Sequence, residues 1–217
     1  MQFDRRRFIG AALAAGVAAC TTRSVAPLPG PAATPPPPAP LPAVAAARAD
    51  LPPLLAEALA ALERHPIAAR DRLAVVDFSL SSREPRFHLV DVAGGRIEAS
   101  WLVAHGSGSD PAHTGLLHYF SNVPGSNASS NGAYLTADPY FGQHGRSQRL
   151  IGLDPSNDMA MSRAIVIHGA AYVDPALIEA QGRIGRSQGC FAFEQGEVAR
   201  VMERLGEGRL IYAGKVA

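Results

Sequence analysis

The sequence has few cysteines, few aromatic residues and almost no excess charge. Its 217 residues include two cysteines and one tryptophan, and aromatic side chains make up 6% of the chain. Two cysteines allow at most one disulfide. Twenty Lys and Arg against nineteen Asp and Glu leave a formal net charge of +1. Because such a chain has no global field that would draw it onto nucleic acid, we expect no nucleic-acid partner.

Two further absences exclude kinds of site. The sequence has neither a His-Glu-x-x-His motif nor paired Cys and His residues at zinc-ligand spacing, although His105, His113, His118 and His144 are present. The Gly-Ser-Gly-Ser segment at 106–109 is not followed by a lysine at Walker spacing or by a helix start. We therefore expect no metal site, no nucleotide and no cofactor.

The first twenty residues have the layout of a secretory signal. Three arginines at positions 5–7 precede an apolar run over 8–19, and Cys20 follows. Crossing a hydrocarbon core of roughly 30 Å takes about 20 helical residues, so this run is too short for a permanent transmembrane helix. Residues 4–9 also resemble the twin-arginine export signal of bacteria. The sequence does not choose between that route and the general secretory route.

Residues 17–20, Val-Ala-Ala-Cys, resemble the lipobox of bacterial lipoproteins. The resemblance implies a lipid anchor at Cys20 and an exported, periplasmic protein held at a membrane. Thr21 in place of Asp favours the outer membrane by the same resemblance. An ordinary cleaved signal with an incidental cysteine is the alternative. Acylation of Cys20 would leave Cys190 without a disulfide partner in an oxidising compartment.

Composition separates a spacer from a folded domain. Nine of the eighteen prolines lie between Pro27 and Pro42, with Ala in most of the gaps. Such a segment cannot bury enough apolar surface to fold and tends toward extended polyproline II. We expect a lipoprotein signal peptide over 1–20, a disordered Pro/Ala-rich tether over 21–49 and one folded domain over 50–217. We expect the protein to be a monomer.

The folded part is expected to be mainly β with few helices, in a sandwich-like arrangement. Amphipathic patterns predict a helix that follows Asp50 and a second over 198–205, which Gly206 ends. Short runs rich in apolar and β-branched residues predict strands over 73–78, 87–92, 97–103, 133–137, 149–153, 164–168 and 209–212. Gly94 and Gly95 predict a tight hairpin. Residues 106–132 are predicted to form a long polar loop, which is usually functional or mobile.

Two segments carry the strongest indication of chemistry. Residues 164–169 form an apolar strand that ends in His168, and Gly169 has no side chain to obstruct approach. Residues 185–190 place Cys190 in a polar loop, which we expect just before a helix. A free thiol with a pKa of about 8.5 is mostly protonated at neutral pH, so a nucleophilic cysteine needs a neighbouring base. Taken alone, each residue is more often structural, but the two together could form such a pair.

This pattern resembles the L,D-transpeptidase catalytic domain, also called the YkuD domain, and within it the murein L,D-transpeptidase branch. The resemblance to the domain rests on His-Gly at 168–169 and Ser-Gln-Gly-Cys at 187–190. The resemblance to the murein branch takes in further segments at 103–106, 120–122, 129–134, 150–153 and 167–173, so it extends over about residues 70–213. It implies a YkuD-like β-sandwich in which Cys190 is the nucleophile and His168 is the base. Ser187 and Gly189 would shape the loop, and the backbone N–H groups of Gly189 and Cys190 would face a developing oxyanion.

Substrate contacts are less well determined, because the sequence departs from the family at two places. Gln188 stands where many relatives have His, Arg or Trp, and residues 191–193 lack the Arg that is common after the cysteine. Arg183 or Arg186 could pair with a carboxylate of the substrate or be solvated loop charges. The other candidate substrate-binding residues are Gly169, His105, which could line the cleft or only end its strand, and Tyr134, which could belong to the core or the cleft wall.

The resemblance implies acyl transfer on peptidoglycan stem peptides. Cys190 would form a thioester with the third stem residue and expel D-Ala. An amine of a second stem would then give a 3-3 crosslink, or water would give net D-Ala release. Two alternatives remain open: a cysteine L,D-carboxypeptidase or amidase that uses water, and a non-catalytic peptidoglycan-associated lipoprotein. The expected partners are stem peptides and, through Cys20, a membrane.

Overall fold

The computed structural model describes residues 53–216. The predicted signal peptide and tether, the predicted lipidation site Cys20 and the predicted cap Asp50 lie outside these residues. The described elements are α2 (Pro53–Arg64), β1 (Arg72–Asp77), β2 (Phe87–Asp91), β3 (Arg96–Trp101), the 3-10 turn η1 (Ser107–Ser109), β4 (Gly132–Gly142), β5 (Gly145–Gly152), β6 (Val166–Gly169), α3 (Pro175–Gln181), β7 (Phe191–Phe193), α4 (Val198–Leu205) and β8 (Leu210–Gly214).

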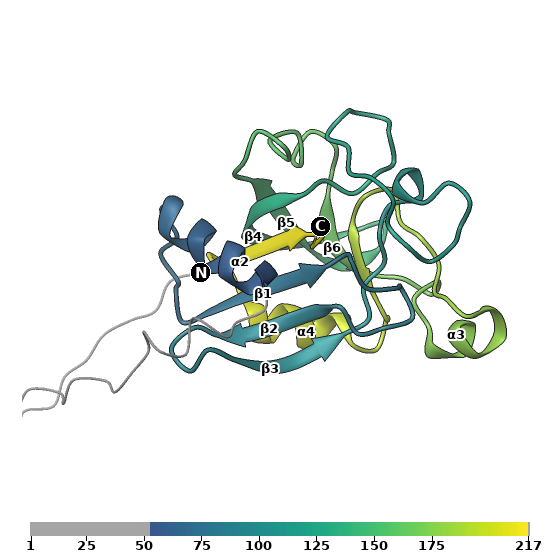
Figure 1. Cartoon of the computed structure of the whole chain (residues 1–217), viewed down its shortest axis with the longest axis horizontal. Coiled ribbons are helices and arrows are strands. Elements are labelled where there is room, and N and C mark those ends of the chain that lie inside the picture. Colours follow the sequence, from purple (N-terminus) through teal and green to yellow (C-terminus); the bar gives the residue numbers. More distant parts are fainter. Residues whose placement is uncertain (1–52, 217) are drawn as a thin grey trace, which may run out of the picture. The chain divides into compact units, whose positions relative to one another are not determined.

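The strands form one sheet in the order β3-β2-β1-β8-β4-β5-β6-β7 (Figure 1). The β1–β8 and β6–β7 pairs are parallel, and the others are antiparallel. The two ends of the sheet approach each other, because Ala104 after β3 pairs with Ala192 of β7. The rings of Phe87 in β2 and Phe193 in β7 also pack with their centroids 4.9 Å apart. The predicted class, mainly β with a sandwich-like arrangement and few helices, is confirmed.

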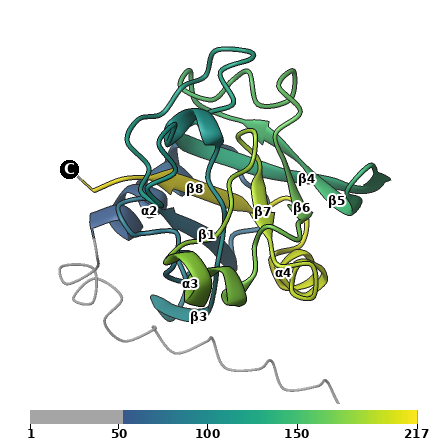
Figure 2. The ribbon, with the colours of Figure 1, turned by 90° about the vertical axis from the view of Figure 1, so that its right-hand side faces the viewer.

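One helix covers each side of the sheet. The apolar face of α2 contributes Leu54 and Leu62 to a core that includes Leu73 of β1 and Leu210 of β8. On the other side, α4 packs into the larger core that all eight strands enclose (Figure 2). Its buried residues are Val198, Val201, Met202 and Leu205, the i, i+3, i+4, i+7 set from which the helix was predicted. Within residues 53–216, no helix has the length and apolar character needed to span a membrane.

The predicted strands are present, with shifts of a few residues at their ends, and the hairpin at Gly94 and Gly95 joins β2 to β3. One strand and one α-helix were missed, as was the 3-10 turn η1. Strand β7 has only three residues, and α3 has seven, so neither is long enough to show a period. The expectation that a helix follows Cys190 directly is wrong, because β7 comes first and α4 begins at Val198.

The long polar segment 106–132 folds back on itself through its own hydrogen bonds. The Gly106 N–H donates to the Ser129 hydroxyl, and the Gly108 N–H donates to the Asn127 carbonyl. The two arms lie so close that a Cβ on Gly108 would be 1.9 Å from the Ser126 carbonyl oxygen. Glycine is therefore required at this position. The fold of this segment places residues 124–127 beside the pocket described below.

Candidate active site

The parallel pair β6–β7 brings His168 and Cys190 to one place. In its register, His168 lies opposite Ala192. Cys190 immediately precedes β7, and its side chain lines the same pocket as that of His168. Ile167 and Phe191 belong to the core. Two motifs that are separated in the sequence are thus brought together by one strand pairing.

The imidazole of His168 is held by a backbone carbonyl. Its Nδ1 lies 3.0 Å from the carbonyl oxygen of Gly169. A carbonyl only accepts hydrogen bonds, so the neutral ring carries its proton on Nδ1 and leaves Nε2 as an acceptor. Burial is the main effect that lowers the pKa of His168, and the neighbouring His144 lowers it further. The ring is therefore a neutral base at physiological pH.

The loop that carries the thiol is closed by Ser187. Its hydroxyl donates to the Cys190 carbonyl at 2.7 Å and accepts from the Gly189 N–H at 3.1 Å. Gly189 has a φ of +109°, and a Cβ there would lie 2.7 Å from the Ala128 carbonyl oxygen. Only glycine suits this position. Its N–H donates to the Ser187 hydroxyl and is therefore not free for the oxyanion role expected of Gly189 in this conformation.

The sulfur of Cys190 sits beside a carbonyl. The thiol donates to the Ala164 oxygen at 3.5 Å, and Ala164 has a left-handed φ of +52°. Burial raises the pKa of the Cys190 thiol. The Val166 N–H and the charge of Arg163 act in the opposite direction and lower it, but burial is the larger effect. Together with the lowered pKa of His168, this indicates a resting pair of neutral thiol and neutral imidazole.

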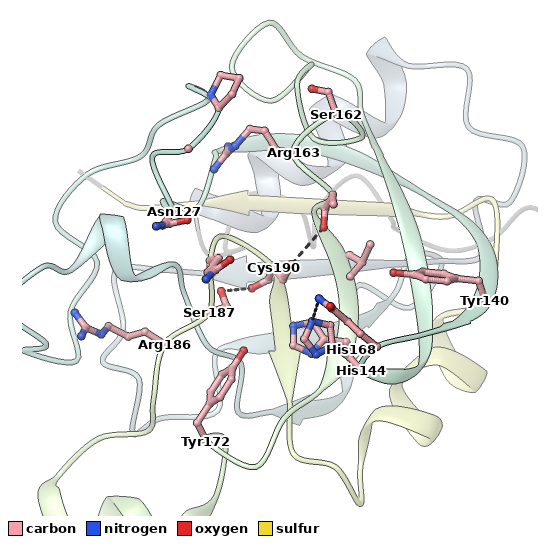
Figure 3. A pocket seen from close by; sticks show the side chains of 16 residues that line it. Asn127, Tyr140, His144, Ser162, Arg163, His168, Tyr172, Arg186, Ser187 and Cys190 are labelled. Atoms are coloured by element: carbon pink, nitrogen blue, oxygen red, sulfur yellow. Dashed lines mark hydrogen bonds between the residues drawn. The ribbon is translucent and has the colours of Figure 1, made fainter.

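Both side chains open into a pocket of about 840 Å³ (Figure 3). Figure 3 shows Cys190 in the middle of the pocket, His168 and His144 on one side of it and Arg163 on the other. Of the residues that line the pocket, none is Asp or Glu, whereas two are arginines. The pocket is therefore suited to a substrate that carries a carboxylate.

Arg163 is a site residue that the sequence analysis missed. Its guanidinium donates to the Ser121 carbonyl at 2.8 Å, to the Ser130 hydroxyl at 2.6 Å and to the Ala128 carbonyl. It also lies against Gly189, the residue before Cys190. Arg163 thus ties the 106–132 segment to the thiol loop. Its position in a polar turn with no motif offered no signal for this role.

The prediction that His105 contacts substrate is wrong, because its side chain is completely buried. Arg86, also fully buried, donates to Nδ1 of His105 at 2.7 Å. The Nε2 of His105 lies 3.3 Å from a carboxylate oxygen of Asp110. Arginine only donates, so His105 is a neutral ring with its proton on Nε2. Its carbonyl accepts from the Ser187 N–H at 2.9 Å, so His105 supports the thiol loop from behind.

Three other predicted substrate contacts lie elsewhere. Tyr134 is 1% exposed and donates its hydroxyl to the Ser130 carbonyl, so it belongs to the core. Gly169 packs against the start of α4, where a Cβ would lie 3.1 Å from a methyl carbon of Val198. Arg183 lies outside the pocket and donates to the nearby Gln181 carbonyl. Arg186 does line the pocket, as does Tyr172.

The histidines other than His168 do not converge on a metal site. His113 Nε2 lies 3.1 Å from the Ile184 carbonyl, and His118 lies near Thr114. His144 is at the turn between β4 and β5. Among residues 53–216, no group of three His, Cys, Asp or Glu side chains is placed to hold a metal ion.

The sequence profile of the family described as L,D-transpeptidase catalytic domain matches residues 52–213. This chain belongs to the L,D-transpeptidase catalytic domain family. The match covers almost all of the folded part, including β6, β7 and the loop that carries Cys190. The resemblance inferred from the two motifs is thereby confirmed. No curated protein matches the chain in sequence.

Solved L,D-transpeptidases are similar to the chain at low identity. The enzyme from Mycobacterium smegmatis is 13% identical with a TM-score of 0.41, over 66% of this chain and 58% of that one. The enzyme from Xylanimonas cellulosilytica is 13% identical with a TM-score of 0.39, over 72% and 68%. L,D-transpeptidase 3 from Mycobacterium tuberculosis, solved with a faropenem-derived adduct, is 12% identical with a TM-score of 0.41, over 66% and 60%. The matched region spans less than two thirds of the Mycobacterium smegmatis protein.

Proposed function

We propose that this chain is a cysteine L,D-transpeptidase that acts on peptidoglycan stem peptides. Cys190 takes the acyl group as a thioester, and His168 is its base. The observation that supports this most directly is that both side chains line one pocket, with His168 at the end of β6, Cys190 directly before its partner β7, and His168 Nε2 left as an acceptor. Membership of the family supports the class of substrate.

The reaction has two acyl-transfer steps. The sulfur of Cys190 attacks the carbonyl carbon of the third stem residue while His168 Nε2 takes the thiol proton. The C–N bond breaks, His168 returns that proton to the departing nitrogen, and D-Ala leaves. An amine of a second stem then attacks the thioester, and its proton passes through His168 to the sulfur. This restores the thiol and leaves a 3-3 crosslink, whereas water as the acceptor leaves a shortened stem.

Intact-mass spectrometry of the full-length protein with a carbapenem tests the nucleophile. We expect the native protein to gain the whole mass of the drug, because the thiol opens the β-lactam ring and no group is expelled. The Cys190→Ala variant should gain none. An adduct on both proteins, or on neither, would contradict the assignment, and the second result would favour a non-catalytic wall-binding protein.

Purified muropeptides identify the acceptor. Crosslinked dimers that require Cys190 support transpeptidation. Shortened stems alone support a carboxypeptidase that uses water, and released amines alone support an amidase. The same Cys190→Ala protein is the control for contaminating hydrolases, since it lacks the sulfur but keeps the fold of the pocket.

Arg186 is expected to bind a carboxylate of the stem peptide. It lines the pocket, its guanidinium donates to the carbonyls of Asp110 and Pro111, and no acidic side chain lines the pocket with it. A hydrogen bond to a charged group contributes about 1.5–3 kcal/mol, so Arg186→Gln should raise KM for the donor about tenfold or more with little change in kcat. Arg183→Gln is the matched control outside the pocket. Equal effects of the two substitutions in steady-state kinetics would contradict a specific role for Arg186.

A further inference from the structure

The β4–β5 hairpin brings a second imidazole onto the base. Gly142 pairs with Gly145, so the turn between the strands consists of Gln143 and His144. The ring of His144 stacks on the ring of His168, with centroids 4.2 Å apart and planes 20° apart (Figure 3). His168 is 2% exposed, whereas His144 is exposed at the tip. The hairpin tip thus covers a side chain at the centre of the proposed chemistry.

Two sets of contacts hold the tip in this position. The amide nitrogen of Gln143 lies 3.0 Å from Nε2 of His144. Below the tip, the guanidinium of Arg149 in β5 lies 4.2 Å from the centre of the Tyr140 ring in β4. Arg149 also pairs with Asp138 at 2.6 Å. Contacts between the two strands therefore stiffen the arm that carries His144.

We infer that His144 is a positioning residue for His168, so that the tip of the β4–β5 hairpin takes part in acylation. This inference rests on the proposed function, in which His168 becomes positively charged as it takes the thiol proton. A flat ring on one face restricts rotation of the His168 ring about its bond to Cβ and keeps Nε2 directed into the pocket.

Several elements contribute titratable and charged side chains to the pocket around His168. The titratable and charged side chains of the pocket around it are His144 and Tyr140 from the hairpin, Arg163 before β6, Tyr172 after it, and Arg186 and Cys190 from the loop before β7. After burial, His144 is the group that lowers the pKa of His168. A substitution that removes the His144 ring nitrogens is therefore expected to raise the pKa of His168.

Acylation by a carbapenem, followed by stopped-flow and intact mass, tests the inference on the full-length protein. His144→Ala should lower the maximal acylation rate constant about tenfold with the half-saturating concentration unchanged within twofold. His144→Phe keeps a flat ring and should recover to within about threefold of the native rate. Phe141→Ala, which removes an 84% exposed neighbour on the same hairpin, is the matched control and should match the native protein.

The pH dependence separates positioning from a merely structural role. In both His144 variants, the acid limb of the acylation rate should move to higher pH, as should the titration of the His168 ring followed by NMR. The NMR measurement needs no turnover. If the native protein is acylated and His144→Ala shows the same rates and the same His168 titration, this inference is overturned. The proposed function would then still stand. An absence of acylation in the native protein would overturn both.

Discussion

Replacement of His168 by Asn is expected to slow acylation of Cys190 by about 10²–10⁴-fold, the usual contribution of a positioned general base. The Asn side-chain NH₂ can still donate to the Gly169 carbonyl, as Nδ1 of His168 does at 3.0 Å. The substitution therefore removes the Nε2 acceptor but keeps the hydrogen bond that orients the side chain. The measurement is the rate of carbapenem adduct formation at pH 7, with the melting temperature as a check on folding.

The pH profile gives this prediction a second test. Burial and His144 lower the pKa of His168, so the ring stays neutral at pH values below its ordinary value near 6.5. Native acylation should therefore decline only when the pH falls below that lowered pKa. The His168→Asn protein has no such base and should lack this limb. A variant that reacts as fast as the native protein at pH 7, with the same acid limb, would remove His168 from the mechanism.

Acidification from pH 7 to pH 4 is expected to lower the free energy of unfolding by about 3 kcal/mol through the titration of His105 alone. Burial, followed by the charge of Arg86, lowers the pKa of His105 from 6.5 to about 4. In the unfolded chain the ring takes up a proton near pH 6.5, whereas in the folded chain it does not. Proton uptake thus favours the unfolded state between these two values. The contribution of His105 to the free energy of unfolding is fully present above about pH 6.5 and is lost between pH 6.5 and 4. Below pH 4, His105 causes no further loss.

A matched variant separates the effect of His105 from the titration of the carboxylates. In His105→Gln, the side-chain oxygen can accept from Arg86 and the nitrogen can donate to Asp110, but the side chain does not titrate. Urea denaturation at pH 7, 5.5 and 4 gives the free energy of unfolding of both proteins. The native protein should lose about 3 kcal/mol more than the variant over this range. Equal losses would show that His105 does not hold a depressed pKa.

Features that depend on a few neighbouring residues could be predicted from the sequence, whereas features that depend on pairing between distant segments could not. The helix over 198–205 was predicted because one apolar period within eight residues determines its buried face. Strand β7 was missed because three residues carry no period, and it exists only through pairing with β6 and with Ala104. The candidate pair of His168 and Cys190 was found because each lies in a short motif that local chemistry explains.

The errors at the site have a common cause. His105 follows a predicted strand, which favoured a place in the cleft, and Tyr134 was left between the core and the cleft wall, yet both are buried with internal hydrogen-bond partners. His144 and Arg163 lie in turns without any motif, yet both line the pocket. A strand-end position predicts that a side chain is near an edge of the sheet. It does not predict which neighbours cover that side chain.

The amino-acid sequence by itself determined the chemical groups of this protein and their motifs: a thiol in a Ser-Gln-Gly-Cys loop, an imidazole at the end of an apolar strand, and a mainly β domain after a proline-rich segment. These features depend on residue type and short-range spacing. Only the tertiary structure decided which histidine stacks on the base, which arginine lies against the thiol loop and which polar residues are buried. Those outcomes depend on the order of eight strands, which brings together segments that no local pattern relates.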